Sequence, residues 1–354
     1  MGLIPTLTEQ IARARADLRI GLPVRITTPQ GAWLAAAVET LTPDRLTALM
    51  ALGPAELALT DRRAQTLKTA AYDGDLLRIA ARADLDWLRG LADPALDLDY
   101  PLKTPLHPLR AGDPTAARTA LALAKSAQLL PAVLLVAAPD MPGLTSIPAS
   151  ATLTELTRAA AFMPVAAANL PISASEVTRL HVYRPDDGGT EHYAIEVGTP
   201  DPDHPVLTRL HSACFTGDVL GSLKCDCGPQ LHAALDTMAK AGGGVLLYLN
   251  QEGRGIGLAN KMRAYSLQNQ GFDTVEANHR LGFQDDERDF RIGAALLRRL
   301  GIGTVRLLTN NPRKIDMLRD HGINVTERVP LIVDRNKFNA AYLATKAAKS
   351  GHLL

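Results

Sequence analysis

Three cysteines lie within fourteen residues of this 354-residue chain, which contains no others. They are Cys214, Cys225 and Cys227. Three gathered thiols without a fourth are typical of a catalytic zinc site, where three protein ligands leave one position to water or substrate. Water bound there loses a proton near neutral pH and becomes a nucleophile. Two alternatives stay open: three unrelated buried cysteines, or a structural zinc site closed by His211, His232 or His279.

Two turns downstream could bind phosphate. The segment 251–258 contains three glycines and Arg254, and it lies between a predicted strand and a predicted helix. The segment 309–314, which begins Thr-Asn-Asn-Pro, likewise follows a strand and opens a helix. Backbone amides in such turns and at helix N-termini bind anions. The glycine spacing does not match the dinucleotide-binding fingerprint, so ordinary turns remain the alternative.

A cluster of charge lies at residues 281–290, where four carboxylates surround Arg288. Neighbouring carboxylates could orient this arginine and remove a proton from it, which would make it reactive. The alternative is a solvated helix start, where acidic residues favour the N-terminal dipole.

Strands and helices alternate along the first 170 residues, which predicts a layered α/β (α+β) domain. Helices are expected over 9–20, 61–69 and 115–129, and strands over 24–26, 56–59 and 132–137. A turn-rich stretch at 171–176 marks the junction, so we predict domains at 1–172 and 173–354. The second domain is expected to contain strands 177–183, 192–197, 245–249 and 304–308, and helices over 229–241 and from 313.

Composition limits the class of protein. Hydrophobic residues make up 46% and charged residues 21%, as in a soluble protein with real cores. A net charge of +1 and 4% aromatics argue against a nucleic-acid partner. No segment has the roughly 20 apolar residues of a membrane span, and no secretory signal is expected. Clustered thiols without further cysteines indicate a reducing compartment, so we expect a cytoplasmic protein with no membrane partner.

The motifs together resemble GTP cyclohydrolase II, the zinc enzyme that opens riboflavin biosynthesis. The resemblance runs from about Val177 to Leu354. It rests on the strings 210–227 around the cysteines, Gln-Glu-Gly-Arg at 251–254, Asp-Thr-Val-Glu-Ala-Asn-His at 273–279, Asp-Glu-Arg-Asp-Phe at 286–290 and Leu-Leu-Thr-Asn-Asn-Pro at 307–312.

The resemblance implies hydrolysis of GTP to 2,5-diamino-6-(5-phosphoribosylamino)pyrimidin-4(3H)-one, formate and pyrophosphate. Cys214, Cys225 and Cys227 would hold one Zn²⁺, which activates the water that opens the guanine ring at C8. Arg288 matches the proposed nucleophile on the α-phosphate, Asp286 the proton acceptor and Tyr265 a residue that assists ring opening. Mg²⁺ is expected with the phosphates, and the family suggests a homodimer. Contacts to GTP are implied for Arg209, Leu210, His211, Ser212, Ala213, Gln230, Glu252, Gly253, Arg254, Thr274, Thr309 and Lys314.

Three positions depart from the family pattern. Ala213 replaces a glutamate, Leu249-Asn250 replaces His-Arg, and Gly255 replaces an asparagine. These changes leave the zinc ligands, Asp286 and Arg288 intact, so the hydrolytic chemistry is expected to survive. Two alternatives follow: a paralogue acting on another purine nucleotide or in another pathway, and a zinc-containing nucleotide-binding regulatory protein.

The N-terminal half looks like a worn copy of 3,4-dihydroxy-2-butanone 4-phosphate synthase. The resemblance lies in short strings at 22–24, 37–43, 57–60, 107–111 and 124–132. The acidic string that binds magnesium in that family is replaced by Thr-Thr-Pro-Gln-Gly-Ala-Trp at 27–33. Hard cations need oxygen ligands, so we predict a domain without synthase activity that serves dimerisation or steadies the catalytic domain.

Overall fold

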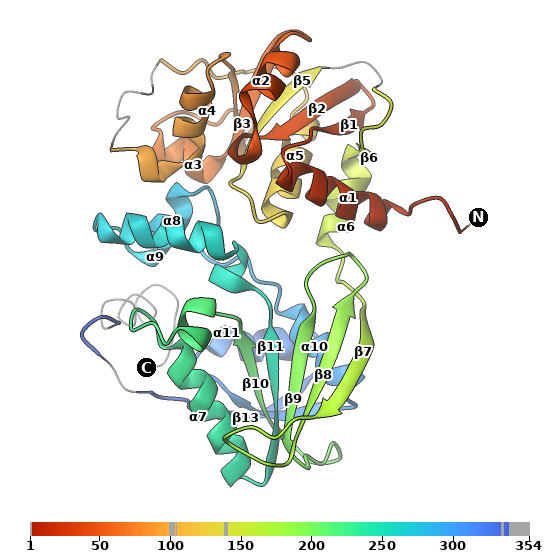
Figure 1. Ribbon diagram of the computed structural model, residues 1–354, viewed down its shortest axis with the longest axis vertical. Helices are drawn as coiled ribbons and strands as arrows, with labels where there is room; N and C mark the ends of the chain where they lie inside the picture. Colours follow the sequence, from red (N-terminus) through yellow and green to blue (C-terminus); the bar gives the residue numbers. More distant parts are fainter. Residues whose placement is uncertain (1, 99–102, 104, 138–140, 334–335, 340–354) are drawn as a thin grey trace. The chain divides into compact units, whose positions relative to one another are not determined.

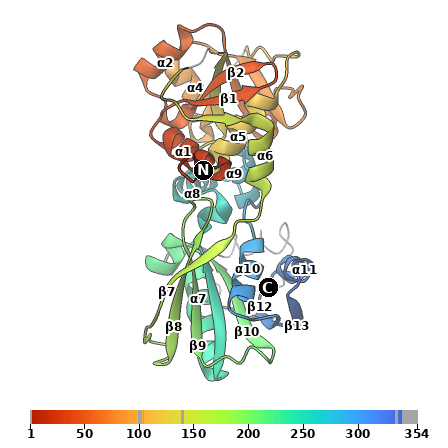
Figure 2. The ribbon, with the colours of Figure 1, turned by 90° about the vertical axis from the view of Figure 1, so that its right-hand side faces the viewer.

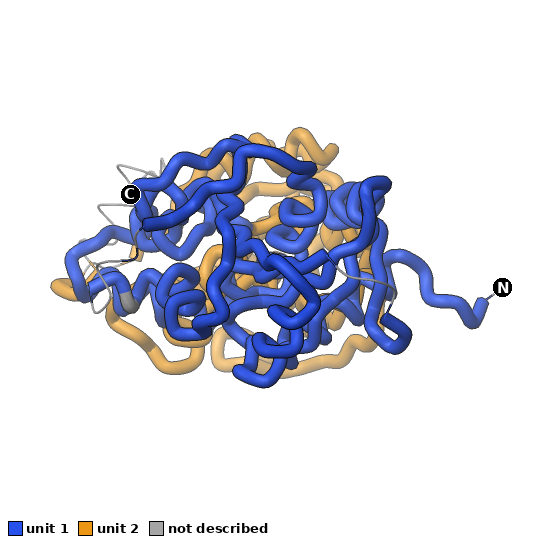
Figure 3. The backbone as a smooth tube through the Cα atoms, turned by 90° about the horizontal axis from the view of Figure 1, so that it is seen from above, with its two compact units in different colours: residues 1–158, 256–287 blue, residues 159–255, 288–354 orange. Residues whose placement is uncertain are grey.

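The chain forms two compact units in a computed structural model that describes residues 2–98, 103, 105–137, 141–333 and 336–339. The first unit comprises residues 1–158 and 256–287, and the second comprises residues 159–255 and 288–354 (Figure 3). Each unit combines one β-sheet with helices, which confirms the predicted α/β (α+β) class with two layered bodies. Residues 340–354, the end of the predicted second domain, lie outside the described part of the chain.

The first unit is built on a six-stranded sheet in the order β4-β3-β5-β2-β1-β6. Its strands are β1 (Val24–Thr28), β2 (Gly31–Ala37), β3 (Ala55–Thr60), β4 (Leu76–Ala80), β5 (Ala132–Ala137) and β6 (Ser146–Pro148). All neighbours are antiparallel except β1 and β6. Its helices are α1 (Leu7–Arg19), α2 (Pro43–Met50), α3 (Asp61–Thr66), α4 (Leu85–Ala92), α5 (Thr115–Ser126), α6 (Ala149–Thr157), α8 (Leu258–Asn269) and α9 (Thr274–Arg280).

Alternation along the strands gives this unit a core on each face of its sheet. Leu57 and Leu59 of β3 pack in one cluster with residues of α2, α4, α8 and α9. Ala58, between them, packs in the other cluster with residues of α1 and α5. Because successive strand side chains point to opposite faces, the apolar run of β3 is buried on both sides. The unit is therefore a sheet between two layers of helices.

The second unit contains a seven-stranded sheet in the order β13-β12-β10-β11-β9-β8-β7. The strands are β7 (Phe162–Asn169), β8 (Thr178–Pro185), β9 (His192–Gly198), β10 (Val206–Ser212), β11 (Gly243–Leu249), β12 (Thr304–Leu308) and β13 (Asn324–Val329). The four strands from β13 to β11 are parallel, and β9, β8 and β7 continue the sheet in antiparallel register. Its helices are α7 (Cys227–Lys240), α10 (Arg291–Arg299) and α11 (Pro312–Asp320).

Helices cover both faces of this second sheet (Figures 1 and 2). Helix α7 packs through Met238 against Leu207 and Leu246, whereas α10 and α11 pack on the opposite face against Leu210. Gly293 lets α10 approach closely, because a Cβ atom there would lie 2.5 Å from Cδ2 of Leu210. The parallel strands β10, β11 and β12 all end at one edge of the sheet, and predicted site residues lie at the end of β10 and in the loops that follow all three strands.

The compact units differ from the predicted segments 1–172 and 173–354 in two places. Strand β7 pairs with β8, so the second unit begins at residue 159. Residues 256–287 belong by contact to the first unit, because apolar side chains such as Leu267 and Phe283 join its core. The assignment of two domains, one of them non-catalytic, stays a prediction.

Most of the predicted elements are present, with shifts of a few residues at their ends. The helices predicted to end at 69 and 129 end instead at Thr66 and Ser126. Just beyond each end, Lys68 and Gln128 adopt left-handed backbone conformations, which stop a helix. Among the residues that the structure describes, no helix has the length and apolar character to cross a bilayer.

Candidate metal centre and active site

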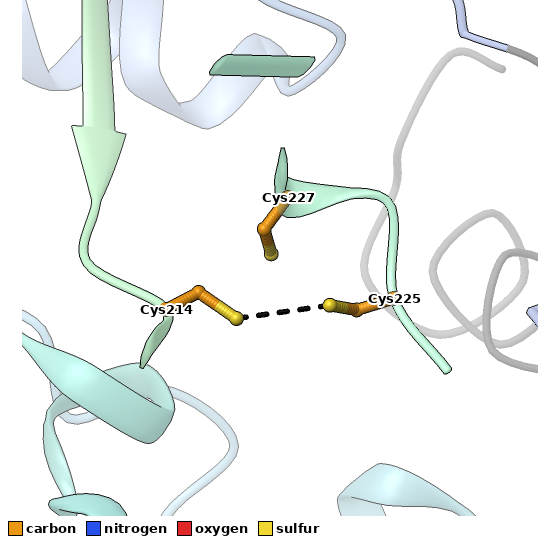
Figure 4. A group of neighbouring side chains, drawn as sticks. All are labelled: Cys214, Cys225 and Cys227. Carbon is orange, nitrogen blue, oxygen red and sulfur yellow. Dashed lines mark hydrogen bonds between the residues drawn. The ribbon is translucent and has the colours of Figure 1, made fainter. Parts of the chain in front are cut away.

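The three cysteine sulfurs meet at the C-terminal edge of the second unit's sheet (Figure 4). Cys214 follows β10, Cys225 lies in the next loop and Cys227 begins α7. All three ligand atoms lie within 4.8 Å of one another, and the sulfurs of Cys214 and Cys225 are 3.7 Å apart. Two thiolates bound to tetrahedral zinc at about 2.3 Å are separated by about 3.8 Å. The cluster therefore fits zinc, and its spacing is far too long for a disulfide.

The chain leaves space for this cluster by placing a glycine inside it. A Cβ atom on Gly217 would lie 2.8 Å from the sulfur of Cys225, 3.0 Å from that of Cys214 and 3.0 Å from Cβ of Cys227. Gly217 lies in a π-helical turn, Phe215–Val219, directly after the first ligand. Any other residue at 217 would intrude among the thiols.

The histidines proposed as a fourth ligand do not join the sulfur cluster. His211 and His232 lie in the second unit, and neither belongs to the group of ligand atoms found among the described residues. His279 lies in the first unit. The pKa of the Cys225 thiol is raised, chiefly by its hydrogen bond with Cys214. Deprotonation of such a thiol accompanies metal binding, and three sulfurs leave a fourth position for another ligand.

A buried carboxylate, Asp218, organises the turn that carries the first ligand. One of its oxygens accepts hydrogen bonds from the backbone amide of Cys214 and from the hydroxyl of Tyr248, both at 2.9 Å. The carboxylate also lies 3.1 Å from Nε2 of His211. The rings of His211 and Tyr248 stack at 5.6 Å because these residues are register partners on β10 and β11. Asp218 and Tyr248 were absent from the predicted site.

Burial affects the titration of these side chains. It raises the pKa of Tyr248, and the nearby Asp218 carboxylate adds to that effect. Burial lowers the pKa of His211, which favours the neutral form of its ring. His211 contacts Asp218, which in turn accepts from the backbone amide of Cys214, so His211 helps to hold the turn that carries Cys214.

Arg209 and Gln230, two predicted substrate contacts, bind each other inside the second unit. The guanidinium of Arg209 donates to the side-chain oxygen of Gln230 and to the carbonyl of Leu308. Gln230 donates in turn to Asp226, which lies between Cys225 and Cys227 in the chain. Burial lowers the pKa of Arg209 to about 10. Only 7% of the surface of Arg209 is exposed. Through Gln230 and Asp226, Arg209 helps to hold the segment that carries Cys225 and Cys227.

Two cations gather around one aromatic ring near the end of β10. The guanidinium of Arg288 lies 4.8 Å and the ammonium of Lys314 5.2 Å from the ring centre of Phe290. Arg288 donates to the hydroxyl of Ser212, and Lys314 donates to the carbonyl of Leu210. The structure thus brings together four predicted site residues, and the paired positive charge suits phosphate oxygens. Phe290 is not among the predicted site residues.

The Gln-Glu-Gly-Arg turn is held by its own side chains. Gln251 accepts from the backbone amide of Asp289 at 2.7 Å and donates to its carbonyl at 2.9 Å, which fixes the residue beside Arg288. Glu252 accepts from the amides of Phe215 and Gly253, so its carboxylate joins this turn to the cysteine loop. Gly253 and Arg254 share a left-handed conformation at φ 64°.

The positions that depart from the family pattern have structural roles. Ala213 donates its backbone amide to Leu249, and only 9% of its surface is exposed. The side chain of Asn250 donates to the carbonyl of Glu191, and its backbone amide donates to Nδ1 of His192. Gly255 adopts φ 92°, which favours glycine there.

Thr309, a predicted substrate contact, follows β12. It is buried, and its hydroxyl accepts a hydrogen bond from the backbone amide of Asn311.

Three predicted site residues belong to the first unit. Tyr265 lies on α8, where the ammonium of Lys261 is 5.7 Å from its ring centre. Thr274 begins α9 behind an Asp273–Glu276 capping box, and its hydroxyl accepts from Gln268. Asp286 lies in the loop before α10, so the acidic cluster precedes that helix without forming its first turn. The remaining predicted residues lie in the second unit.

Comparison with known proteins gives one consistent family. Residues 164–330 match the model of the GTP cyclohydrolase II family. A GTP cyclohydrolase-2 from Azospirillum brasilense is 44% identical over 360 residues, covering 97% of this chain and 93% of that protein. GTP cyclohydrolase-2 from Cronobacter sakazakii is 62% identical over 166 residues, 47% of this chain and 84% of that protein. A solved two-domain 3,4-dihydroxy-2-butanone 4-phosphate synthase from A. baumannii aligns with 92% of this chain at a TM-score of 0.30 and 16% identity, too low to bear on the fold. The whole-length similarity to the Azospirillum protein shows that the chain belongs to the GTP cyclohydrolase II family, whose members are hydrolases.

Proposed function

We propose that the chain is a zinc-dependent GTP cyclohydrolase II that converts GTP to 2,5-diamino-6-(5-phosphoribosylamino)pyrimidin-4(3H)-one, formate and pyrophosphate. The observation that carries this proposal is the group of three sulfurs within 4.8 Å of one another in a chain of this family. Zinc bound by Cys214, Cys225 and Cys227 supplies the Lewis acid and the activated water needed to open the imidazole ring.

The protein's own residues would handle the triphosphate. Arg288 and Lys314 present two positive charges around Phe290, where they can bind the phosphate oxygens and stabilise the charge that develops on them. In the family pattern Arg288 attacks the α-phosphorus while Asp286 takes its proton. The bond to the β-phosphate breaks and pyrophosphate leaves. Water then hydrolyses the phosphorus–nitrogen bond to Arg288, which frees the 5′-phosphate and restores the arginine. Gln251 would hold the backbone of Asp289 during this step.

Ring opening would use the other group of residues. The turn bearing Cys214 is held by Asp218, and Glu252 fixes the amide of Phe215 next to it. These contacts would restrict the movement of the turn that carries Cys214, and so preorganise the site. In the family pattern Tyr265 assists through its hydroxyl. Two C–N bonds at C8 are hydrolysed, and that carbon leaves as formate.

The N-terminal half is proposed to have no synthase activity. Strands β1 and β2 are joined by the two residues Pro29 and Gln30, and Thr28 pairs directly with Gly31. This tight turn replaces the acidic loop of the synthase family. Conversion of ribulose 5-phosphate by the purified protein would contradict the proposal. Homodimer formation, Mg²⁺ with the phosphates and a cytoplasmic location also stay proposals drawn from the resemblance and composition.

Product identification tests the proposed substrate. The purified zinc-loaded protein is incubated with Mg²⁺ and with GTP, ITP or ATP in parallel, and the products are identified by mass spectrometry. We expect the diaminopyrimidine product from GTP and no ring opening of ATP. Turnover of ITP faster than GTP would favour the paralogue that acts on another purine nucleotide. GTP binding without any turnover would favour a regulatory protein.

A further inference from the structure

The loop at residues 281–287, which contains Asp286, is fastened to the N-terminal half at three hydrogen-bonded points. The hydroxyl of Thr60 donates to the carbonyl of Gly282 at 2.9 Å. Arg62 donates twice to the side chain of Gln284, at 3.1 and 3.0 Å. The ammonium of Lys125, on α5, lies 2.7 Å from the carboxylate of Glu287. All of these residues belong to the first unit.

Packing reinforces these polar contacts. Phe283 is 1% exposed in the core cluster that contains Leu57 and Leu59. The Lys125 ammonium is 5.7 Å from the centre of its ring. Gly282 adopts φ 87°, and a Cβ atom there would lie 2.8 Å from both Pro131 and Thr60. The loop is therefore packed closely against the N-terminal half, and a side chain at 282 would clash with it.

Glu287 is the last residue of the loop, and its two neighbours in the chain, Asp286 and Arg288, are the residues to which the family pattern gives reactive roles. One oxygen of its carboxylate accepts from both the backbone amide of Gln284 and Lys125, at 2.8 and 2.7 Å. Glu287 lies between Asp286 and Arg288 in the chain. Asp289 is held separately by Gln251 within the second unit. Arg288 is thus flanked by two residues whose positions are fixed by other side chains.

The side chains that fasten the loop lie outside the segment that matches the family model. The family match covers residues 164–330 and includes the loop, whereas Thr60, Arg62 and Lys125 precede it. The relative from Cronobacter sakazakii aligns over 166 residues and 84% of its length, which leaves little chain for a counterpart of the N-terminal half. In this chain the fastening therefore depends on side chains of the N-terminal half.

We propose that Lys125 is a positioning residue for the cyclohydrolase reaction, acting through Glu287 on Asp286 and Arg288. The proposal rests on the proposed function. Under this proposal the N-terminal half, for which we propose no synthase activity, holds the loop that contains the proton acceptor Asp286. Lys125 would not touch the nucleotide, so it should affect the rate of the chemical step more than the binding of GTP.

The test compares variants of the full-length zinc-loaded protein. Lys125→Met removes the ammonium and keeps most of the stem. Arg118→Met is the matched control, since Arg118 lies on the same helix and pairs with Asp75 at 2.6 Å, away from the loop. We expect kcat for formate and pyrophosphate release to fall about tenfold in Lys125→Met, since small misplacements of reacting groups cost up to about 100-fold. KM, zinc content and melting temperature should match the control.

Charge reversal separates positioning from a loss of fold. Lys125→Glu should lower kcat at least as far as Lys125→Met, and adding Glu287→Lys should recover part of the loss by restoring an ion pair of opposite polarity. Equal kcat in Lys125→Met and Arg118→Met, or no recovery in the double variant, would overturn the proposal. Amide hydrogen exchange over residues 282–287 provides a readout that needs no turnover. Faster exchange in Lys125→Met supports the fastening even if the wild type fails to hydrolyse GTP, and unchanged exchange overturns it.

Discussion

The space at Gly217 gives the sharpest prediction for the metal centre. The substitution Gly217→Ala adds one methyl group among the three ligands, 2.8 Å from one sulfur and 3.0 Å from a second. Ordinary contacts between heavy atoms are about 3.5–4.0 Å. The thiols or the turn must therefore move by about 0.5–1 Å. The backbone conformation of Gly217 is not left-handed, so alanine introduces no torsional strain that would confuse the result.

A displacement of this size exceeds what a zinc site tolerates. Ligand distances in working sites stay within about 0.2 Å of their standard values. Changes to groups that orient metal ligands commonly lower metal affinity by about 10- to 100-fold. We therefore expect zinc affinity to fall by a factor of this order in Gly217→Ala, with formate release falling in parallel at limiting zinc.

The assay is competition for zinc with a chromophoric chelator, together with a melting curve for each variant. Gly303→Ala is the matched control, because among the described residues, its chain neighbours apart, none has an atom within 4 Å of a Cβ at that position, and its φ is not in the left-handed region. It should bind zinc as the wild type does. A folded Gly217→Ala protein with wild-type zinc affinity would refute the reasoning about the ligand cluster.

Two further predictions concern buried polar groups. Asp218→Asn places an amide donor where an oxygen now accepts two hydrogen bonds. The protein should therefore lose roughly 1–3 kcal/mol of unfolding free energy and bind zinc more weakly. Urea unfolding and zinc titration that match the wild type would argue against a role for Asp218 in holding the turn that carries Cys214. Burial lowers the pKa of His192 from 6.5 to about 4, and its Nδ1 accepts from the amide of Asn250. The unfolded chain therefore binds the proton more readily, and stability should fall as the pH drops from about 6.5 to 4, by at most roughly 3 kcal/mol. The fall should be smaller in His192→Gln than in the wild type, as measured by urea unfolding across that pH range; an equal fall in the two proteins would contradict the role of His192.

The thiol cluster could be predicted from the sequence because its geometry is local. Three cysteines within fourteen residues can meet only if the intervening loop folds back on itself. The strand ends that precede the two turns proposed to bind phosphate were also predictable, since apolar runs such as 245–249 and 304–308 form the buried parallel strands β11 and β12.

The supports of the site depend on tertiary register and could not be predicted in the same way. Tyr248 reaches Asp218 because β10 and β11 pair so that His211 lies beside Tyr248. Nothing in the spacing of these residues fixes that register. Residues 256–287 were assigned to the second domain because they lie between its motifs, yet their apolar faces pack in the core of the first unit. The order of motifs along the chain does not determine whether helices α8 and α9 pack in the core of the first unit or of the second.

The most direct test of the proposed reaction measures formate and pyrophosphate together from GTP, in zinc- and magnesium-loaded wild type and in Cys225→Ser. We predict equal amounts of formate and pyrophosphate from the wild type, and no formate from the variant, because one of the three thiols proposed to hold zinc is lost. Formate release from Cys225→Ser at the wild-type rate, or none from the wild type, would contradict the assignment of ring opening to the cysteine cluster.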